Sequence, residues 1–120
     1  MTQTQNSKQY DLEDRTLTFA REVIEFVKVL PKTIVNVEVT KQLVRSSGSV
    51  GANYIEANEA LGKKDFTMRI RICRKEAKES RYWLNLVEAR GEDAEGKRRS
   101  LIDEAGQLMR IFGSILEKTK

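Results

Sequence analysis

Residues 63–87 read KKDFTMRIRICRKEAKESRYWLNLV. Apolar or small side chains recur along this stretch at alternating spacings of four and three residues: Phe66, Ile70, Cys73, Ala77, Ser80, Leu84 and Val87. This spacing keeps one seam of an α-helix turned toward its neighbours. It is typical of helices that pack in a bundle with a shallow left-handed crossing. We therefore predict an all-α bundle built around this helix.

Helix breakers divide the rest of the chain into similar segments. Pro31, Gly62 and Gly91 are residues of the kind that end or separate helices. They leave four segments, which predict helices at about residues 12–30, 36–61, 64–90 and 94–118. Short turns make consecutive helices antiparallel. We predict one domain, an up-down-up-down four-helix bundle over residues 11–120, preceded by a flexible tail at residues 1–10.

The second segment leaves alternatives to a continuous helix. Val35 to Val39 alternate apolar and polar residues as a strand does, but a single strand has no partner in this chain. We prefer a helix, with Thr33 or Asn36 as its cap. Residues 46–52 are small and include two glycines, which fits a loop or a helix that a neighbouring backbone approaches closely. We again prefer the helix.

Length and cysteine content indicate the class of protein. At 120 residues the chain can bury one core without disulfides. Its single cysteine, Cys73, lies on the seam, where we expect a small buried hydrophobe and not a catalytic thiol. No apolar run approaches the roughly 18 residues of a membrane span, and residues 1–9 lack the layout of a secretory signal. We expect a cytoplasmic protein without membrane contact.

Charge is concentrated on the third segment. The chain has a net charge of +4, and residues 63–81 alone carry eight Lys or Arg against three Asp or Glu. Five of these basic residues fall on one flank of the predicted helix, and we call them the basic flank: Arg71, Arg74, Lys75, Lys78 and Arg81. A basic stripe on one helix suits an anionic partner such as RNA or DNA. The alternative is that these side chains are solvated or pair with acids of a neighbouring subunit.

The opposite flank of the same helix is more apolar than a monomer ordinarily leaves exposed. Its large side chains are Ile72, Trp83 and Leu86, which we expect at an oligomer interface. A second basic cluster, Lys97 to Arg99, lies at the start of the fourth predicted helix. We interpret that cluster as a solvated helix end.

The residue types exclude catalysis by histidine and give no direct sign of other catalytic chemistry. The chain has no histidine, which excludes histidine general bases and imidazole metal ligands, and it has no glycine-rich phosphate loop. Two carboxylate pairs with helical spacing remain as the alternative: Glu56, Glu59, Glu76 and Glu79. On neighbouring helices such pairs can hold Mg²⁺, in a pattern that resembles the all-α nucleoside-triphosphate pyrophosphohydrolases. We predict no enzyme activity, no cofactor and no metal, and keep that hydrolase as an alternative.

A longer resemblance covers about two thirds of the chain. The run Gln42 to Ala57, QLVRSSGSVGANYIEA, is followed by Asp65-Phe66 and then by KEAKESRYWL at residues 75–84. In order and spacing these motifs resemble the four helix bundle protein family. That family includes bacterial proteins encoded in intervening sequences of 23S ribosomal RNA genes and is related to the accessory protein of diversity-generating retroelements.

The resemblance implies a homopentamer. It also implies a partner among nucleic acids or proteins, since related accessory proteins bind nucleic acid and a reverse transcriptase. Asn53, Glu56 and Glu79 match polar positions of the family, and we expect them to form a polar network between the second and third helices. The predicted function is thus a non-enzymatic oligomeric scaffold whose basic flank binds RNA or DNA non-specifically. A protein-binding adaptor without nucleic acid is the remaining alternative.

Overall fold

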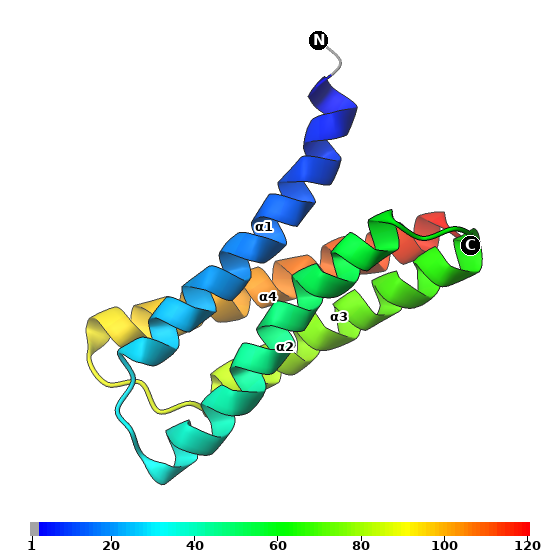
Figure 1. Ribbon diagram of the computed structural model, residues 1–120. Helices are drawn as coiled ribbons and strands as arrows, with labels where there is room; N and C mark the ends of the chain where they lie inside the picture. The colour runs from blue at the N-terminus through cyan, green and yellow to red at the C-terminus, as the bar shows by residue number, and fades with distance from the viewer. Residues whose placement is uncertain (1–2) are drawn as a thin grey trace.

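The computed structural model describes the backbone of residues 3–120 and the side chains of residues 12–120. It contains four helices, α1 (Gln3–Lys28), α2 (Ile34–Asn58), α3 (Lys63–Leu86) and α4 (Glu92–Lys118). Each helix is antiparallel to the next, α3 packs between α2 and α4, and α1 contacts α2 and α4 (Figure 1). Toward its N-terminal end α1 leans away from the other three helices (Figure 1). The predicted four-helix bundle is confirmed.

The helix boundaries differ most from the prediction at two places. Helix α1 begins at Gln3, inside the segment expected as a tail, so the predicted start at residue 12 was wrong. Residues 3–11 contain neither glycine nor proline, and nothing in their sequence interrupts a helix. Helix α3 ends at Leu86 and not at residue 90, because Val87 adopts an extended conformation, with φ −65° and ψ 150°. None of the described helices is long and apolar enough to span a bilayer.

The seam of α3 lies in the core as its spacing predicts. Six of its seven members are buried and the seventh, Phe66, packs against them. The seam meets large side chains from the other helices, including Phe19 and Phe26 of α1, Leu43 of α2 and Phe112 of α4. Ser80, the polar member, shares a 2.8 Å hydrogen bond with Ser46 of α2, so its burial leaves no hydroxyl unpaired.

Helix α2 is continuous through its glycines, which confirms the preference for a helix. Gly51 faces α1 at close range, since a Cβ there would lie 3.0 Å from the Oγ1 atom of Thr16 and 3.7 Å from its backbone carbonyl carbon. Gly48 has nothing within 4 Å of the same position. The close approach of α1 to α2 therefore depends on Gly51 and not on Gly48.

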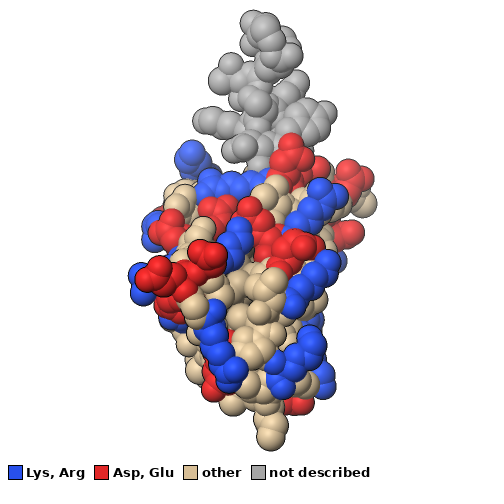
Figure 2. Space-filling view, turned by 90° about the vertical axis from the view of Figure 1, so that its left-hand side faces the viewer, with Lys and Arg blue, Asp and Glu red and all other residues tan. Residues whose placement is uncertain are grey.

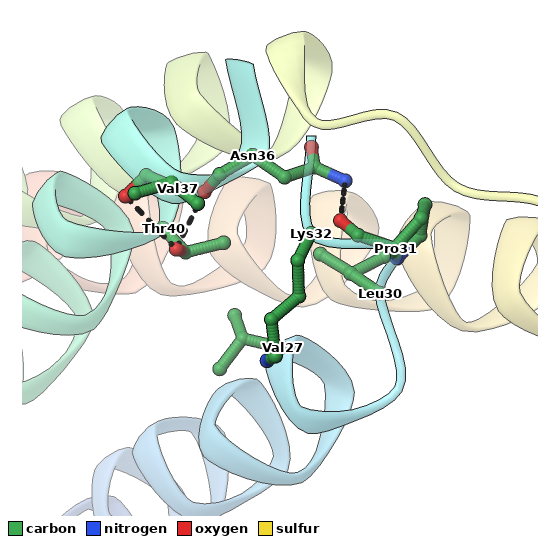
Figure 3. Close-up of a pocket in the computed structure, with 7 residues that line it drawn as sticks. All are labelled: Val27, Leu30, Pro31, Lys32, Asn36, Val37 and Thr40. Carbon is green, nitrogen blue, oxygen red and sulfur yellow. Dashed lines mark hydrogen bonds between the residues drawn. The ribbon is translucent and has the colours of Figure 1, made fainter. Parts of the chain in front are cut away.

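The two loops at one end of the bundle are joined by a single buried side chain. Thr33 caps α2 by accepting a hydrogen bond from the backbone N–H of Asn36. The Asn36 amide then donates to the Pro31 carbonyl at 2.8 Å (Figure 3). It also donates to the Glu88 carbonyl at 2.9 Å, and its oxygen accepts from the Glu88 N–H. Of the two candidate caps, Thr33 caps the helix and Asn36 ties the α1–α2 loop to the α3–α4 connection.

Candidate nucleic-acid interface

The basic flank is exposed and lacks acidic partners. Arg71, Arg74, Lys75 and Lys78 are exposed and Arg81 is half-buried. Among residues 12–120, none of the five forms an ion pair with a carboxylate. An unpaired cation on a helix surface keeps its field available to a ligand.

The two glutamates of α3, Glu76 and Glu79, pair with an arginine from α2. Arg45 donates to Glu79 at 2.8 Å and to Glu76 at 3.4 Å, and the Trp83 indole donates to Glu79 at 3.3 Å. Burial raises the pKa of Glu76. Burial also opposes ionisation of Glu79, but the hydrogen bonds from Arg45 and Trp83 outweigh it and lower the pKa of that carboxyl group. Glu76 and Glu79 thus form their ion pairs with Arg45 of α2 and not with the basic flank, of which only Lys75 has an electrostatic interaction with Glu76.

The second basic cluster is arranged differently. Arg98 and Arg99 both donate to Glu95 on their own helix, at 2.7 and 3.2 Å, and Lys97 pairs with Glu22 of α1 at 3.3 Å. Arg98 also donates to the Leu84 carbonyl near the end of α3. The cluster therefore pairs within the bundle, which the expectation of a solvated helix end did not include, while Arg99 remains 76% exposed.

Elsewhere the surface mixes charges of both signs. The face turned to the viewer in Figure 2 carries basic and acidic side chains next to one another, with uncharged surface between them. The basic flank itself divides between two surfaces. Arg74 and Arg81 line a groove against α4, together with Arg110. Arg71, Lys75 and Lys78 are exposed on the remaining outer surface of α3.

Sequence reasoning missed Arg110. It lies outside the basic segment, and its only sequence signal is its position four residues after Gly106, which places the two on one face of α4. It also missed Arg45, whose pairing with Glu76 and Glu79 depends on the register between α2 and α3.

The predicted polar network between α2 and α3 does not form as a unit. Asn53 accepts a hydrogen bond from Arg69 at 3.1 Å and donates to Ser49, while Glu79 binds Arg45 and Trp83. Glu56 is exposed and has no hydrogen-bond partner among the described side chains. The prediction placed all three residues on facing helices but did not include the arginines. Arg45 binds Glu79 and Arg69 binds Asn53, so the polar groups form two separate clusters.

The predicted interface residues are only partly available to another subunit. Ile72 and Trp83 are half-buried, and Trp83 packs against the core, whereas Leu86 is 44% exposed. More exposed apolar surface lies along α1 and α2, at Leu17 and Ile55. Both residues line a groove of about 310 Å³ whose floor includes Gly48, Gly51 and Ala52.

The alternative metal site has no geometric support in the described part of the chain. Glu56 and Glu59 are exposed, and Glu76 and Glu79 are held by Arg45. Within residues 12–120 no three acidic, cysteine or histidine side chains come together as metal ligands. Cys73 is fully buried, which confirms that it is a small core residue, and burial raises the pKa of its thiol to about 12.

The fold and these motifs agree with a known family. The model of the 23S rRNA-intervening sequence protein family matches residues 8–114. The chain belongs to this family. A solved structure from Bacteroides thetaiotaomicron VPI-5482, a protein of unknown function from the S23 ribosomal protein family, is similar at 29% sequence identity and a TM-score of 0.75. The similarity covers 92% of this chain and 98% of the Bacteroides chain. No curated protein matches the chain.

Membership of the 23S rRNA-intervening sequence protein family confirms the resemblance drawn from residues 42–57 and 75–84. The structural relative is itself of unknown function.

Proposed function

We propose that this protein is a non-enzymatic homo-oligomeric scaffold that binds RNA or DNA non-specifically through the basic flank of α3. The observation that carries the proposal is the absence of carboxylate partners for all five flank residues among residues 12–120. The clusters around Arg45 and Glu95 show that this protein pairs its arginines where they serve the fold. The basic flank is left for an external anion.

The flank matches a phosphate backbone better than it matches bases. From Arg71 to Arg81 the helix rises by about 15 Å, which is long enough to follow a few consecutive phosphates. Tyr82 is 58% exposed beside the flank and is the side chain best placed for stacking on a base. With so little aromatic surface, recognition should be tolerant of sequence and sensitive to salt.

Assembly would multiply a weak contact on each subunit. The family resemblance implies a homopentamer, and exposed apolar side chains on α1, α2 and the end of α3 offer surfaces for a second copy. Contacts between two different surfaces close into a ring when the rotation per subunit fits. Several flanks in one particle would raise the affinity for a long polyanion through avidity. We place this particle in the cytoplasm, where its single thiol stays reduced.

Binding is tested by a salt titration with matched charge reversals. Fluorescence anisotropy would follow a labelled mixed-sequence RNA and a duplex DNA at several salt concentrations. The variant Arg74→Glu/Lys78→Glu should bind more weakly and lower the slope of log K against log salt by about two. The control Arg21→Glu/Lys32→Glu changes the charge equally at exposed sites outside α3. Equal losses in both variants, or an affinity indifferent to salt, would refute the proposal.

Assembly is tested separately by size-exclusion chromatography with light scattering. A pentamer has five times the 13.8 kDa mass of the chain. A particle of that mass that does not bind nucleic acid would favour the adaptor alternative. A monomer would contradict the scaffold.

A further inference from the structure

The groove between α3 and α4 is lined mainly by cationic side chains. It has a volume of about 410 Å³, and its charged lining consists of Arg74 and Arg81 from α3 with Arg110 and Glu117 from α4. Glu117 already pairs with Lys120 at 2.9 Å. Three guanidinium groups therefore give the groove a positive potential.

Two of these guanidinium groups converge above Gly106. Arg81 reaches this point from α3, and Arg110, one turn after Gly106, leans back over the glycine as helical side chains do. The Nη1 atom of each arginine lies 3.7 Å from the position that a Cβ on residue 106 would occupy. The two nitrogens are therefore at most twice 3.7 Å apart. A single phosphate, accepting hydrogen bonds of about 2.8 Å on two sides, bridges such a gap.

The converging arginines have no counter-charge of their own. Neither Arg81 nor Arg110 forms an ion pair among residues 12–120, and the same holds for Arg74. Like charges brought together repel one another, and an anion between them removes that repulsion. Guanidinium groups also match the geometry of phosphate oxygens better than ammonium groups do.

The glycine beneath the arginines is not required by helix packing. A Cβ on Gly106 would meet the two Nη1 atoms at ordinary contact distance and no backbone atom. Gly113, which also lines the groove, has nothing within 4 Å of that position. Glycine inside a helix costs about 1 kcal/mol relative to alanine. Unlike Gly51, these glycines do not admit a neighbouring helix, and they keep the floor of the groove open.

We propose that this groove binds one phosphate group, with Arg81 and Arg110 donating from opposite walls and Arg74 adding charge. If the phosphate belongs to a nucleic-acid backbone, the inference rests on the proposed function. The site then adds Arg110 of α4 to the basic flank of α3. Free inorganic phosphate or pyrophosphate has the same chemistry, so the test distinguishes these sources.

The first arm measures binding of the free anion. Thermal unfolding would be followed in sodium pyrophosphate and in sodium chloride of equal ionic strength. Pyrophosphate should raise the midpoint of the wild type more than chloride does, since a ligand of the folded state stabilises it. Arg110→Gln should lose this difference. Gly106→Glu should lose it too, because its carboxylate occupies the position between the arginines. Arg21→Gln, at an exposed site on α1, should retain it.

The second arm measures nucleic-acid affinity for the same variants. Arg110→Gln should weaken binding about tenfold and lower the salt slope by about one, whereas Arg21→Gln should change neither. If Arg110→Gln equals the wild type in both arms, the phosphate site is refuted, while a loss in Arg74→Glu/Lys78→Glu still supports the proposed function. Stabilisation by pyrophosphate without nucleic-acid binding would instead keep the site, with free phosphate as its ligand, and refute the proposed function.

Discussion

The two glycines of α2 should respond in opposite ways to the same substitution. At an ordinary mid-helix site, replacing glycine by alanine stabilises a helix by about 1 kcal/mol. Gly48 has open space around its Cβ position, so Gly48→Ala should show this gain. At Gly51 the added carbon would lie 3.0 Å from Oγ1 and 3.3 Å from Cβ of Thr16. The Thr16 side chain, or the helix that carries it, must then shift by a few tenths of an ångström.

Thr16 has little freedom to move aside. It is 1% exposed, and its hydroxyl donates to the Glu13 carbonyl at 3.0 Å, which fixes its rotamer. Overpacking of this kind costs about 1–3 kcal/mol, which cancels or exceeds the gain in helix propensity. We expect Gly51→Ala to be between neutral and about 2 kcal/mol destabilising, and less stable than Gly48→Ala by about 1–3 kcal/mol.

The assay is urea unfolding followed by circular dichroism at one fixed protein concentration, because assembly couples stability to concentration. Thr16→Ala removes the nearest atom, so the Gly51→Ala substitution should be less costly in that background than in the wild type. Equal stabilisation by Gly48→Ala and Gly51→Ala would show that α1 does not approach α2 as closely as described.

Three further predictions follow from buried or paired side chains. Asn36→Ala should lower the unfolding free energy by about 2–3 kcal/mol, because it leaves the Glu88 N–H and the carbonyls of Pro31 and Glu88 unpaired. A loss below about 0.5 kcal/mol in denaturant titrations would contradict this. Cys73, whose thiol pKa is raised to about 12 by burial, should react with a disulfide reagent at pH 8 only as the protein unfolds, and prompt labelling of the folded protein would refute its burial. Hydrogen bonds from Arg98 lower the pKa of Glu95 from 4.5 to about 2, so this pair stabilises the folded protein above pH 4.5 and loses its effect as the pH falls toward 2. Glu95→Gln should flatten the pH dependence of the melting temperature in that window, and an unchanged profile would argue against the pair.

The helical seams could be predicted because burial and helical periodicity impose the same pattern. Along α3 the spacing of four and three residues identified every buried apolar position, and the small residues of α2 were correctly assigned to a helix. The start of α1 was placed too late because the polar composition of residues 1–9 indicated a tail, although residues 3–11 contain no helix breaker. The end of α3 was wrong because a single apolar residue, Val87, is buried in an extended conformation that helical spacing does not reveal.

The polar contacts were less predictable, because they depend on how the helices are placed relative to one another. Sequence spacing put Asn53, Glu56 and Glu79 on facing helices. Their partners depend on the register between α2 and α3, which decides which arginine of one helix lies opposite each polar group of the other. Arg45 takes Glu76 and Glu79, and Arg69 takes Asn53. The same dependence hid Arg110, which contributes to the candidate site only because Arg81 lies opposite on α3.

The packing of the bundle does not require the positive charge on the basic flank of α3. The bundle needs the seam of α3, and it needs Glu76 and Glu79 to hold Arg45 on α2. None of the ion pairs among residues 12–120 uses a cation at positions 74, 81 or 110. Unpaired guanidinium groups that face one another repel, and the folded state bears that cost. An anionic ligand that binds between the two groups removes this repulsion. The convergence of Arg81 and Arg110 therefore supports a binding site more strongly than the net charge of the chain does.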